Sequence, residues 1–236
     1  MNIGIKTMKG IKLIVAAFIL STILSGFSQA QDWPDLGRFK DENAELGLPK
    51  PDEKRIVFLG NSITEGWINK HPDFFSDKSY VNRGISGQTT PQMILRFRAD
   101  VINLQPAAVV ILAGTNDIAG NTGPSTLEMI MDNLISMAEL AKANNIKVIF
   151  SSVLPAYDYP WRPGLEPWKK IAELNDMIKT YSEKNGILYL DYYSSMVDDC
   201  GGMKDELTYD GVHPNEAGYD VIEPLVEKAI EKVLND

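Results

Sequence analysis

The sequence contains one cysteine and two histidines among its 236 residues. The single thiol, Cys200, excludes a disulfide within the chain, and we expect that thiol to be buried. The two histidines, His71 and His213, are too few for a zinc site of the usual histidine- and cysteine-rich kind.

Basic tracts are also scarce. The formal net charge is −9 and the isoelectric point is about 4.8, and no lysine- or arginine-rich face is evident. Recognition of nucleic acid through its phosphates is therefore not expected, and the negative charge also disfavours anionic membranes and polyanionic substrates. Apolar residues make up 44% and charged residues 23% of the chain, as in a soluble globular protein.

Long apolar runs are limited to residues 13–20, near the N-terminus. Three lysines precede this run, and small and polar residues follow it as far as Ala30. That order is typical of a signal peptide, so we predict that residues 1–30 are removed and that the mature chain is exported to the periplasm or beyond, without a stable membrane anchor. A membrane-anchoring helix is the alternative, although the run is short and is interrupted at Ser21.

The chain after the predicted signal peptide divides into a polar lead-in segment and one domain. Residues 31–54 predict irregular structure with one short helix near residues 36–46, and residues 55–236 alternate apolar runs of β type with helical patterns. The expected strands are 55–60, 79–83, 107–113, 146–153 and 187–191. The expected helices are 63–69, 90–104, 124–144, 166–185 and 215–233, with Thr90 and Ser125 as N-terminal caps of the second and third. This alternation predicts an α/β fold with a five-stranded parallel sheet that is covered by helices on both faces.

The loops that follow parallel strands gather at one edge of a sheet, where such folds bind ligands. Ser62 comes directly after the first strand and opens a helix, so its hydroxyl is expected at this edge beside backbone N–H groups. A nucleophilic serine needs that placement. The alternative is that Ser62 only caps the helix.

Asp210 and His213 precede the last helix and can supply the acid and base that Ser62 needs. An imidazole transfers protons near neutral pH, and a carboxylate three residues upstream can reach its Nδ1–H within one turn. A polar loop or a helix cap is the alternative for this pair. Candidate donors to an oxyanion are the backbone N–H groups of Ser62 and Gly84 and the side-chain amide of Asn116. Gly84 can equally be a turn glycine, and Asn116 can form an Asx-turn.

Together these segments resemble the sequence blocks of the SGNH hydrolases, the GDSL-type lipases and acylhydrolases. The segments that carry the resemblance are Gly60-Asn61-Ser62-Ile63-Thr64, Gly84, Gly114-Thr115-Asn116-Asp117 and Asp210-Gly211-Val212-His213-Pro214. The resemblance implies a flavodoxin-like three-layer α/β/α sandwich and a serine esterase without a metal or other cofactor. It implies Ser62 as nucleophile, His213 as base and Asp210 as its orienting acid, with Ser62, Gly84 and Asn116 forming the oxyanion hole. Asn61 departs from the aspartate usual at that position in the family.

Substrate preference is suggested by an aromatic loop at residues 156–163. Trp161 and Arg162 in this loop, together with Asn61, are candidates for contacts with a substrate, because aromatic faces pack on sugar rings and a guanidinium binds hydroxyls. The alternative is that Trp161 and Trp168 only fix the loop to the body. We expect hydrolysis of short acyl esters, above all acetyl groups on carbohydrates. A lipase, lysophospholipase or thioesterase of the same fold, and a non-catalytic carbohydrate-binding relative, are the alternatives.

Overall fold

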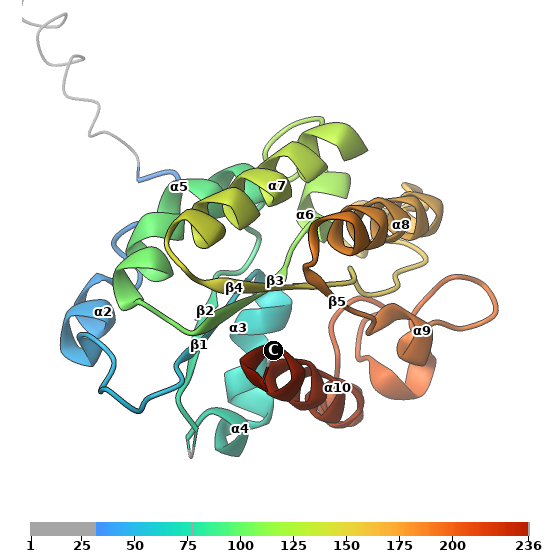
Figure 1. Cartoon of the computed structure of the whole chain (residues 1–236). Coiled ribbons are helices and arrows are strands. Elements are labelled where there is room, and N and C mark those ends of the chain that lie inside the picture. The colour runs from blue at the N-terminus through green and yellow to red at the C-terminus, as the bar shows by residue number, and fades with distance from the viewer. Residues whose placement is uncertain (1–31, 77, 236) are drawn as a thin grey trace, which may run out of the picture. The chain divides into compact units, whose positions relative to one another are not determined.

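Five parallel strands form the central sheet of the unit Pro34–Asp236, in the spatial order β2-β1-β3-β4-β5 (Figure 1). The strands are β1 (Ile56–Gly60), β2 (Tyr80–Gly84), β3 (Ala108–Leu112), β4 (Lys147–Ser151) and β5 (Leu188–Leu190). This computed structural model describes residues 32–76 and 78–235, so the predicted signal peptide at residues 1–30 lies outside the described residues. The strand order is that of flavodoxin-like folds, and it confirms the predicted α/β class.

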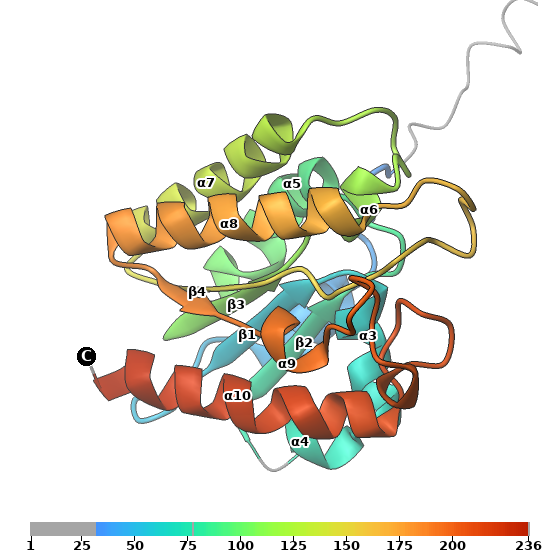
Figure 2. The same ribbon diagram turned by 90° about the vertical axis from the view of Figure 1, so that its right-hand side faces the viewer.

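Helices cover both faces of the sheet (Figure 2). One face packs against α5, α7 and α8, and the other packs against α3, α4 and α10. The helices are α2 (Lys40–Leu46), α3 (Ser62–Lys70), α4 (Pro72–Ser76), α5 (Thr90–Asp100), α6 (Thr115–Ile118), α7 (Leu127–Ala143), α8 (Trp168–Asn185), α9 (Tyr193–Met196) and α10 (Glu216–Asn235), with 3₁₀ turns at Ile102–Leu104 and Asp205–Leu207. The sequence-based ranges agree with these elements to within a few residues at their ends.

Strand β1 shows why the apolar runs are continuous. Val57 and Leu59 pack into the core beneath α5, α7 and α8, whereas Ile56 and Phe58 pack into the core on the opposite face. Because successive side chains of a strand point to opposite faces, a sheet covered on both faces needs apolar residues at every position. The whole of β1 is accordingly buried, and it holds Gly60 and the segment after it at a fixed place.

Two predicted helix caps are displaced by one residue. Thr89, with an extended backbone, caps α5 and forms a capping box with Gln92, so Thr90 is the first helical residue rather than the cap. In α7 the cap is Thr126, whose side chain accepts a hydrogen bond from the N–H of Met129. Neighbouring residues of the same chemical type compete for a cap position, and the backbone conformation decides between them.

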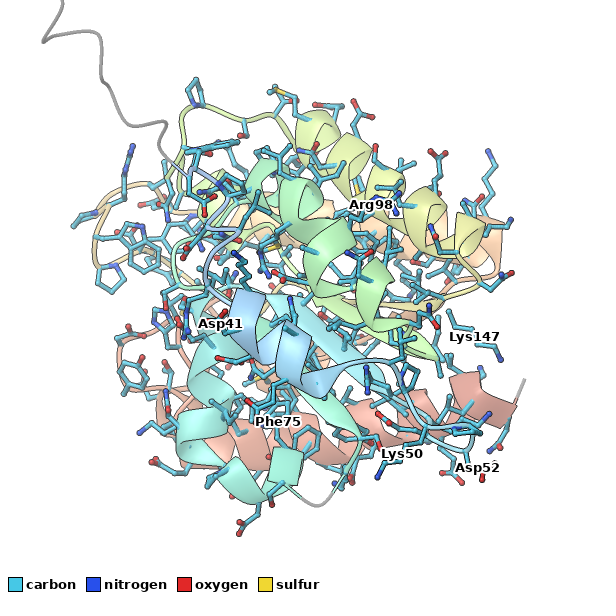
Figure 3. The ribbon with its side chains drawn as sticks, turned by 90° about the vertical axis from the view of Figure 1, so that its left-hand side faces the viewer. Asp41, Lys50, Asp52, Phe75, Arg98 and Lys147 are labelled. Atoms are coloured by element: carbon cyan, nitrogen blue, oxygen red, sulfur yellow. The ribbon has the colours of Figure 1, made fainter. Side chains whose placement is uncertain are left out.

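The edge strand β2 is covered by the lead-in segment. In Figure 3, α2, which carries Asp41, lies along this edge of the fold, and Arg98 is a side chain of α5. Asn43 of α2 accepts hydrogen bonds from Arg83 of β2 and donates one to Asp100 of α5. These contacts protect the open edge of the sheet.

Within the described residues, no helix is both long and apolar enough to cross a membrane.

Candidate active site

Ser62 is the first residue of α3 and lies at the carboxyl end of β1. The cap of α3 is Asn61, whose Oδ1 accepts a hydrogen bond of 3.0 Å from the N–H of Ile63. Gly60 has no room for a side chain, because an added Cβ would lie 2.0 Å from Thr64 Oγ1. Since Asn61 supplies the cap, the hydroxyl of Ser62 is available for another partner.

That partner is His213. Its Nε2 lies 2.9 Å from Ser62 Oγ, and its Nδ1 lies 2.7 Å from Oδ2 of Asp210. A carboxylate can only accept hydrogen bonds, so Nδ1 carries the proton and Nε2 is free to accept the proton of the Ser62 hydroxyl. The structure therefore brings together the three residues that the sequence singles out from two ends of the chain.

The loop geometry fixes Asp210 against His213. Asp210 Oδ1 accepts hydrogen bonds from the backbone N–H groups of Val212, at 3.0 Å, and His213, at 2.8 Å. Burial by itself raises the pKa of Asp210, but the hydrogen bonds from His213 and Val212 outweigh burial and leave the pKa below its usual value. Asp210 is thus ionised near neutral pH, and its negative charge favours a positive charge on the His213 ring beside it.

Asn116, one of the predicted oxyanion donors, has a side-chain amide that makes a hydrogen bond within the protein. It is the second residue of α6, a helix that begins directly after Gly114. Gly114 has a φ of 123°, and a Cβ at this position would lie 2.8 Å from Leu174 Cδ2. The Nδ2 of Asn116 donates to the carbonyl oxygen of Gln88 across 3.0 Å. A side-chain amide has two hydrogens, so the second remains for an oxyanion.

Gly84 does not fit the role of an oxyanion donor. Its N–H already donates to Asn82 Oδ1 at 2.9 Å, and its Cα packs against α3 so closely that an added Cβ would lie 2.1 Å from the backbone nitrogen of Glu65. Gly87, which the sequence analysis missed, is better placed. It is exposed, has a φ of 76°, and precedes Gln88, the residue that Asn116 contacts. Among the described residues its N–H has no hydrogen-bond acceptor.

Asp117 connects this region to α5. Its carboxylate accepts hydrogen bonds from the backbone N–H of Thr90, at 3.0 and 3.1 Å, and from the Thr90 hydroxyl, at 2.6 Å. Desolvation by burial raises the pKa of Asp117 to about 6, although the hydrogen bonds from Thr90 oppose that rise. The carboxylate thus joins the segment that carries Asn116 to the start of α5.

Arg96 is a buried positive charge that helical periodicity alone does not single out. Its Nη2 donates to the carbonyl oxygens of Gly60 and Arg83, both at 3.0 Å, and its Nε donates to Gln88 Oε1 at 2.6 Å. Its Nη1 forms an ion pair of 3.0 Å with Asp100. One guanidinium therefore holds the end of β1, the end of β2 and the loop that contains Gly87.

The aromatic loop is fixed to the body by Trp161, as one of the two alternatives predicted. Trp161 donates from Nε1 to Asn121 Oδ1 at 3.2 Å and stacks on Tyr159, with ring centroids 4.9 Å apart, so it does fix the loop. The residue is also 41% exposed, and its ring centroid lies 6.1 Å from that of His213, so Trp161 stays a candidate for substrate contact. Arg162 donates to the carbonyl oxygen of Gly120.

Two predictions about single residues need correction. Asn61 is 1% exposed and its side chain caps α3, so it is a structural residue and not a substrate contact. Cys200 is exposed rather than buried, because it lies in a turn whose N–H groups bind the carboxylate of Asp198.

The other histidine, His71, pairs with Glu223 at 2.9 Å. Among residues 32–76 and 78–235, no group of three or more potential metal ligands is assembled.

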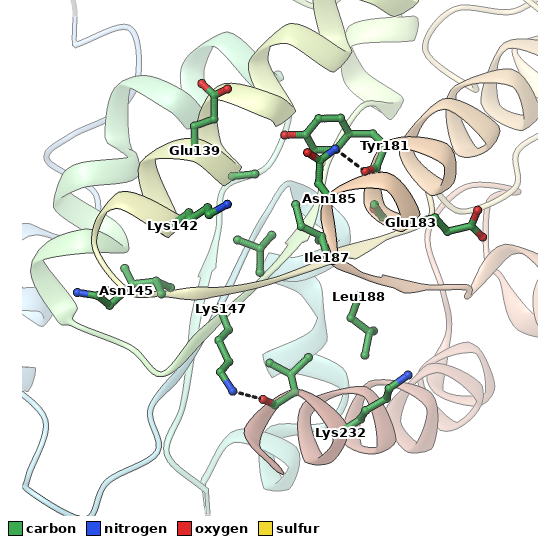
Figure 4. A pocket seen from close by; sticks show the side chains of 16 residues that line it. Glu139, Lys142, Asn145, Lys147, Tyr181, Glu183, Asn185, Ile187, Leu188 and Lys232 are labelled. Carbon is green, nitrogen blue, oxygen red and sulfur yellow. Dashed lines mark hydrogen bonds between the residues drawn. The ribbon is translucent and has the colours of Figure 1, made fainter. Parts of the chain in front are cut away.

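A groove of about 840 Å³ lies at the other end of the sheet (Figure 4). It is bounded by α7, α8 and the last turn of α10, and Lys147, at the start of β4, donates to the carbonyl oxygen of Val233 across it. Because Lys147 and Leu188 are the first residues of their strands, this groove is on the side opposite to Ser62. The chemistry of Ser62 is therefore separate from it.

Comparisons with known proteins show the family to which the chain belongs. Residues 58–221 match the model of the GDSL-like lipase/acylhydrolase family. A solved structure of a GDSL-like lipase from Bacteroides thetaiotaomicron is 52% identical, with a TM-score of 0.82 over 84% of this chain and 98% of that chain. Esterase TesA of Pseudomonas aeruginosa is 27% identical over 66% of this chain and 73% of its own length. An acetylxylan esterase of Xylanibacter ruminicola is 25% identical over 79% of this chain and 45% of its own length. The chain therefore belongs to the GDSL-like lipase/acylhydrolase family and is a carboxylic ester hydrolase.

Proposed function

We propose that this hydrolase works through an acyl-enzyme on Ser62, with His213 as general base and Asp210 as the residue that orients it. The observation that carries the proposal is the continuous chain of contacts from Ser62 Oγ to His213 Nε2, at 2.9 Å, and from His213 Nδ1 to Asp210 Oδ2, at 2.7 Å. Both distances are within hydrogen-bonding range, so a proton can move from the hydroxyl to the imidazole as the nucleophile attacks.

The reaction proceeds in two halves. Ser62 Oγ attacks the ester carbonyl while its proton passes to His213, and the imidazolium then protonates the departing alcohol as the acyl-enzyme forms. Water takes the place of the alcohol, gives a proton to His213 and attacks the acyl carbonyl. His213 then returns this proton to Ser62 Oγ as the carboxylic acid leaves.

The negative charge that develops on the carbonyl oxygen needs fixed donors. The N–H of Ser62 belongs to the first turn of α3, where helical N–H groups have no partner within the helix. The free hydrogen of the Asn116 amide supplies a second donor, and the N–H of Gly87, in place of that of Gly84, supplies a third. The positive end of the α3 dipole has the sign that stabilises this charge.

For the substrate we propose short acyl esters, above all acetyl groups on carbohydrates. Exposed aromatic rings beside His213 support a ring-shaped alcohol, and the relative from Xylanibacter ruminicola is an acetylxylan esterase. The second candidate is a lipase, which the name of the Bacteroides thetaiotaomicron structure favours. Membership of the hydrolase family speaks against the third alternative, a non-catalytic carbohydrate-binding protein.

A chain-length series separates these candidates. The rates of hydrolysis of p-nitrophenyl acetate, octanoate and palmitate are measured with the wild type and with Ser62→Ala as the blank. Activity that depends on Ser62 and falls steeply with chain length supports the short-chain esterase, and acetylated xylo-oligosaccharides are then tested as substrates. Activity that rises with chain length overturns the acetyl assignment in favour of a lipase. Matched thioesters, if cleaved faster than the oxygen esters, would identify a thioesterase.

We also propose that the mature chain is exported, as the basic, apolar and small-residue order of residues 1–30 indicates. A relative in Bacillus subtilis, 25% identical over 62% of this chain, is named a lipoprotein. Sequencing the N-terminus of protein recovered from a bacterial periplasm tests the proposal. A chain that begins near Gln31 supports it, and an intact Met1 in the cytoplasmic fraction contradicts it.

A further inference from the structure

The position of the leaving alcohol follows from the position of His213, and this step depends on the proposed function. In the first half-reaction the imidazolium protonates the alcohol oxygen, so that oxygen must come within hydrogen-bonding distance of Nε2. The remainder of the alcohol must then lie over the side chains that surround His213. Those side chains are therefore able to select the alcohol, whereas the acyl group extends in another direction from the same carbonyl carbon.

Tyr209 is the first of these side chains. Its ring stacks on the His213 ring at an interplanar angle of 12°, with centroids 5.7 Å apart, and the side chain is 64% exposed. Its backbone N–H donates to the carbonyl oxygen of His213, so ring and base belong to the same short loop. The ammonium group of Lys70, 5.9 Å from the ring centroid, stabilises that orientation.

Trp161 is the second, and it comes from a different part of the chain. Its ring lies 6.1 Å from His213 at an angle of 43°, and its position is set by the stack on Tyr159 and the hydrogen bond to Asn121. Tyr159 is itself buried and bonded to the Thr115 hydroxyl at 2.8 Å. Trp161 therefore presents a pre-ordered aromatic surface, which costs little conformational entropy when a ligand binds.

In the part of the chain that the structure describes, the rings of Trp161 and Tyr209 do not contact each other, and His213 is the ring that both approach. We propose that Tyr209 and Trp161 form a subsite for the leaving alcohol that takes a saturated ring with apolar C–H faces, namely the pyranose of an acetylated sugar. Aromatic surfaces bury such faces, whereas the hydroxyls at the rim of the sugar stay in contact with water. An unbranched alcohol offers much less area to two separate rings.

The test compares two acetate esters that differ only in the alcohol. The value of kcat/KM is measured for an O-acetylated methyl xyloside and for ethyl acetate, with the wild type, Tyr209→Ala, Tyr209→Phe and Trp161→Ala. We expect the ratio of the sugar ester to ethyl acetate to fall about tenfold in each alanine variant, mainly through KM, and to be retained in Tyr209→Phe. Activity on ethyl acetate shows that a variant is folded, and Tyr209→Leu replaces the alanine variant if the latter does not fold.

Tyr157 provides the matched control. It is an aromatic residue of the same loop as Trp161, is 48% exposed, and packs against Gly202. Tyr157→Ala should leave both rates and their ratio unchanged. The subsite is overturned if the alanine variants at 161 and 209 lose activity equally on both esters, or if the wild type does not prefer the sugar ester. Both results are compatible with the proposed esterase mechanism, whereas activity that survives in Ser62→Ala overturns that mechanism itself.

Discussion

Arg96 Nη2 lies 3.0 Å from the carbonyl oxygen of Gly60, two residues before Ser62. The same guanidinium pairs with Asp100, and both side chains are almost completely buried. A buried positive charge at this point is costly unless it is paired and hydrogen-bonded. Arg96 has the carboxylate of Asp100 as its ion-pair partner and donates three further hydrogen bonds, to the carbonyl oxygens of Gly60 and Arg83 and to the side chain of Gln88. The same residue therefore stabilises the fold and connects the segments next to Ser62 and Gly87.

Replacement of Arg96 by alanine should therefore lower the free energy of unfolding by about 3–5 kcal/mol, because Asp100 would keep a buried charge without its partner. Urea denaturation measures this change. Arg98, on the exposed side of the same helix, is the matched control, and Arg98→Ala should change stability by less than about 0.5 kcal/mol. If both variants lost a similar amount of free energy of unfolding, the buried charge of Arg96 would contribute no more to stability than an exposed one.

Removal of the base or its partner should act on kcat. His213→Ala is expected to lower kcat by at least about three orders of magnitude, and Asp210→Asn by at least about a hundredfold, because an amide no longer holds the imidazole in the reactive tautomer. Steady-state kinetics on p-nitrophenyl acetate give both values. Near-wild-type turnover by His213→Ala would refute its role as base.

Asn116→Ala should lower kcat roughly a hundredfold with little change in KM, since an oxyanion donor acts only after the carbonyl carbon becomes tetrahedral. Asn69→Ala, which alters an exposed asparagine of α3, serves as the control. An unchanged kcat in Asn116→Ala would restrict Asn116 to its structural contact with Gln88.

Asp117 should make stability fall as pH rises. Its pKa is about 6 in the folded chain and 3.8 for an ordinary aspartate, so between these values the folded chain holds a proton that the unfolded chain has released. The free energy of unfolding therefore begins to fall near pH 4, and above pH 6 the full loss of about 3 kcal/mol is reached. Asp117→Asn, which stays neutral, should gain stability relative to the wild type across this window in denaturation experiments at several pH values. A stability difference that does not vary with pH would contradict the elevated pKa.

The sheet and its flanking helices were predictable because their signals are local. Val109 to Leu112 form a continuous apolar run, and such a run between two helical patterns has few alternatives to a buried parallel strand. Asp210 and His213 were predictable as a pair for a similar reason, since a spacing of three residues brings them together in one turn. Their approach to Ser62 required the strand order as well.

Other features depend on side chains that meet only in the folded chain. The choice between Gly84 and Gly87 rests on Asn82, whose Oδ1 occupies the N–H of Gly84, and no local pattern reveals that contact. Arg96 looks like any charged residue of an amphipathic helix until the two strand ends are placed beside it. Cys200 was expected to be buried from the general behaviour of thiols, but the turn around Asp198 exposes it.

The aromatic loop is organised by one carboxylate. Asp158 accepts hydrogen bonds from the backbone N–H groups of Tyr159, Gly164, Leu165 and Glu166. These bonds close the loop on itself at its base and use no side chain of the segment between Tyr159 and Gly164. The two ends of the loop are thus tied together through backbone N–H groups alone, whereas Trp161 and Arg162 attach its middle to Asn121 and Gly120. Sequence changes between Tyr159 and Gly164 that keep these two attachments should therefore leave the course of the loop unchanged.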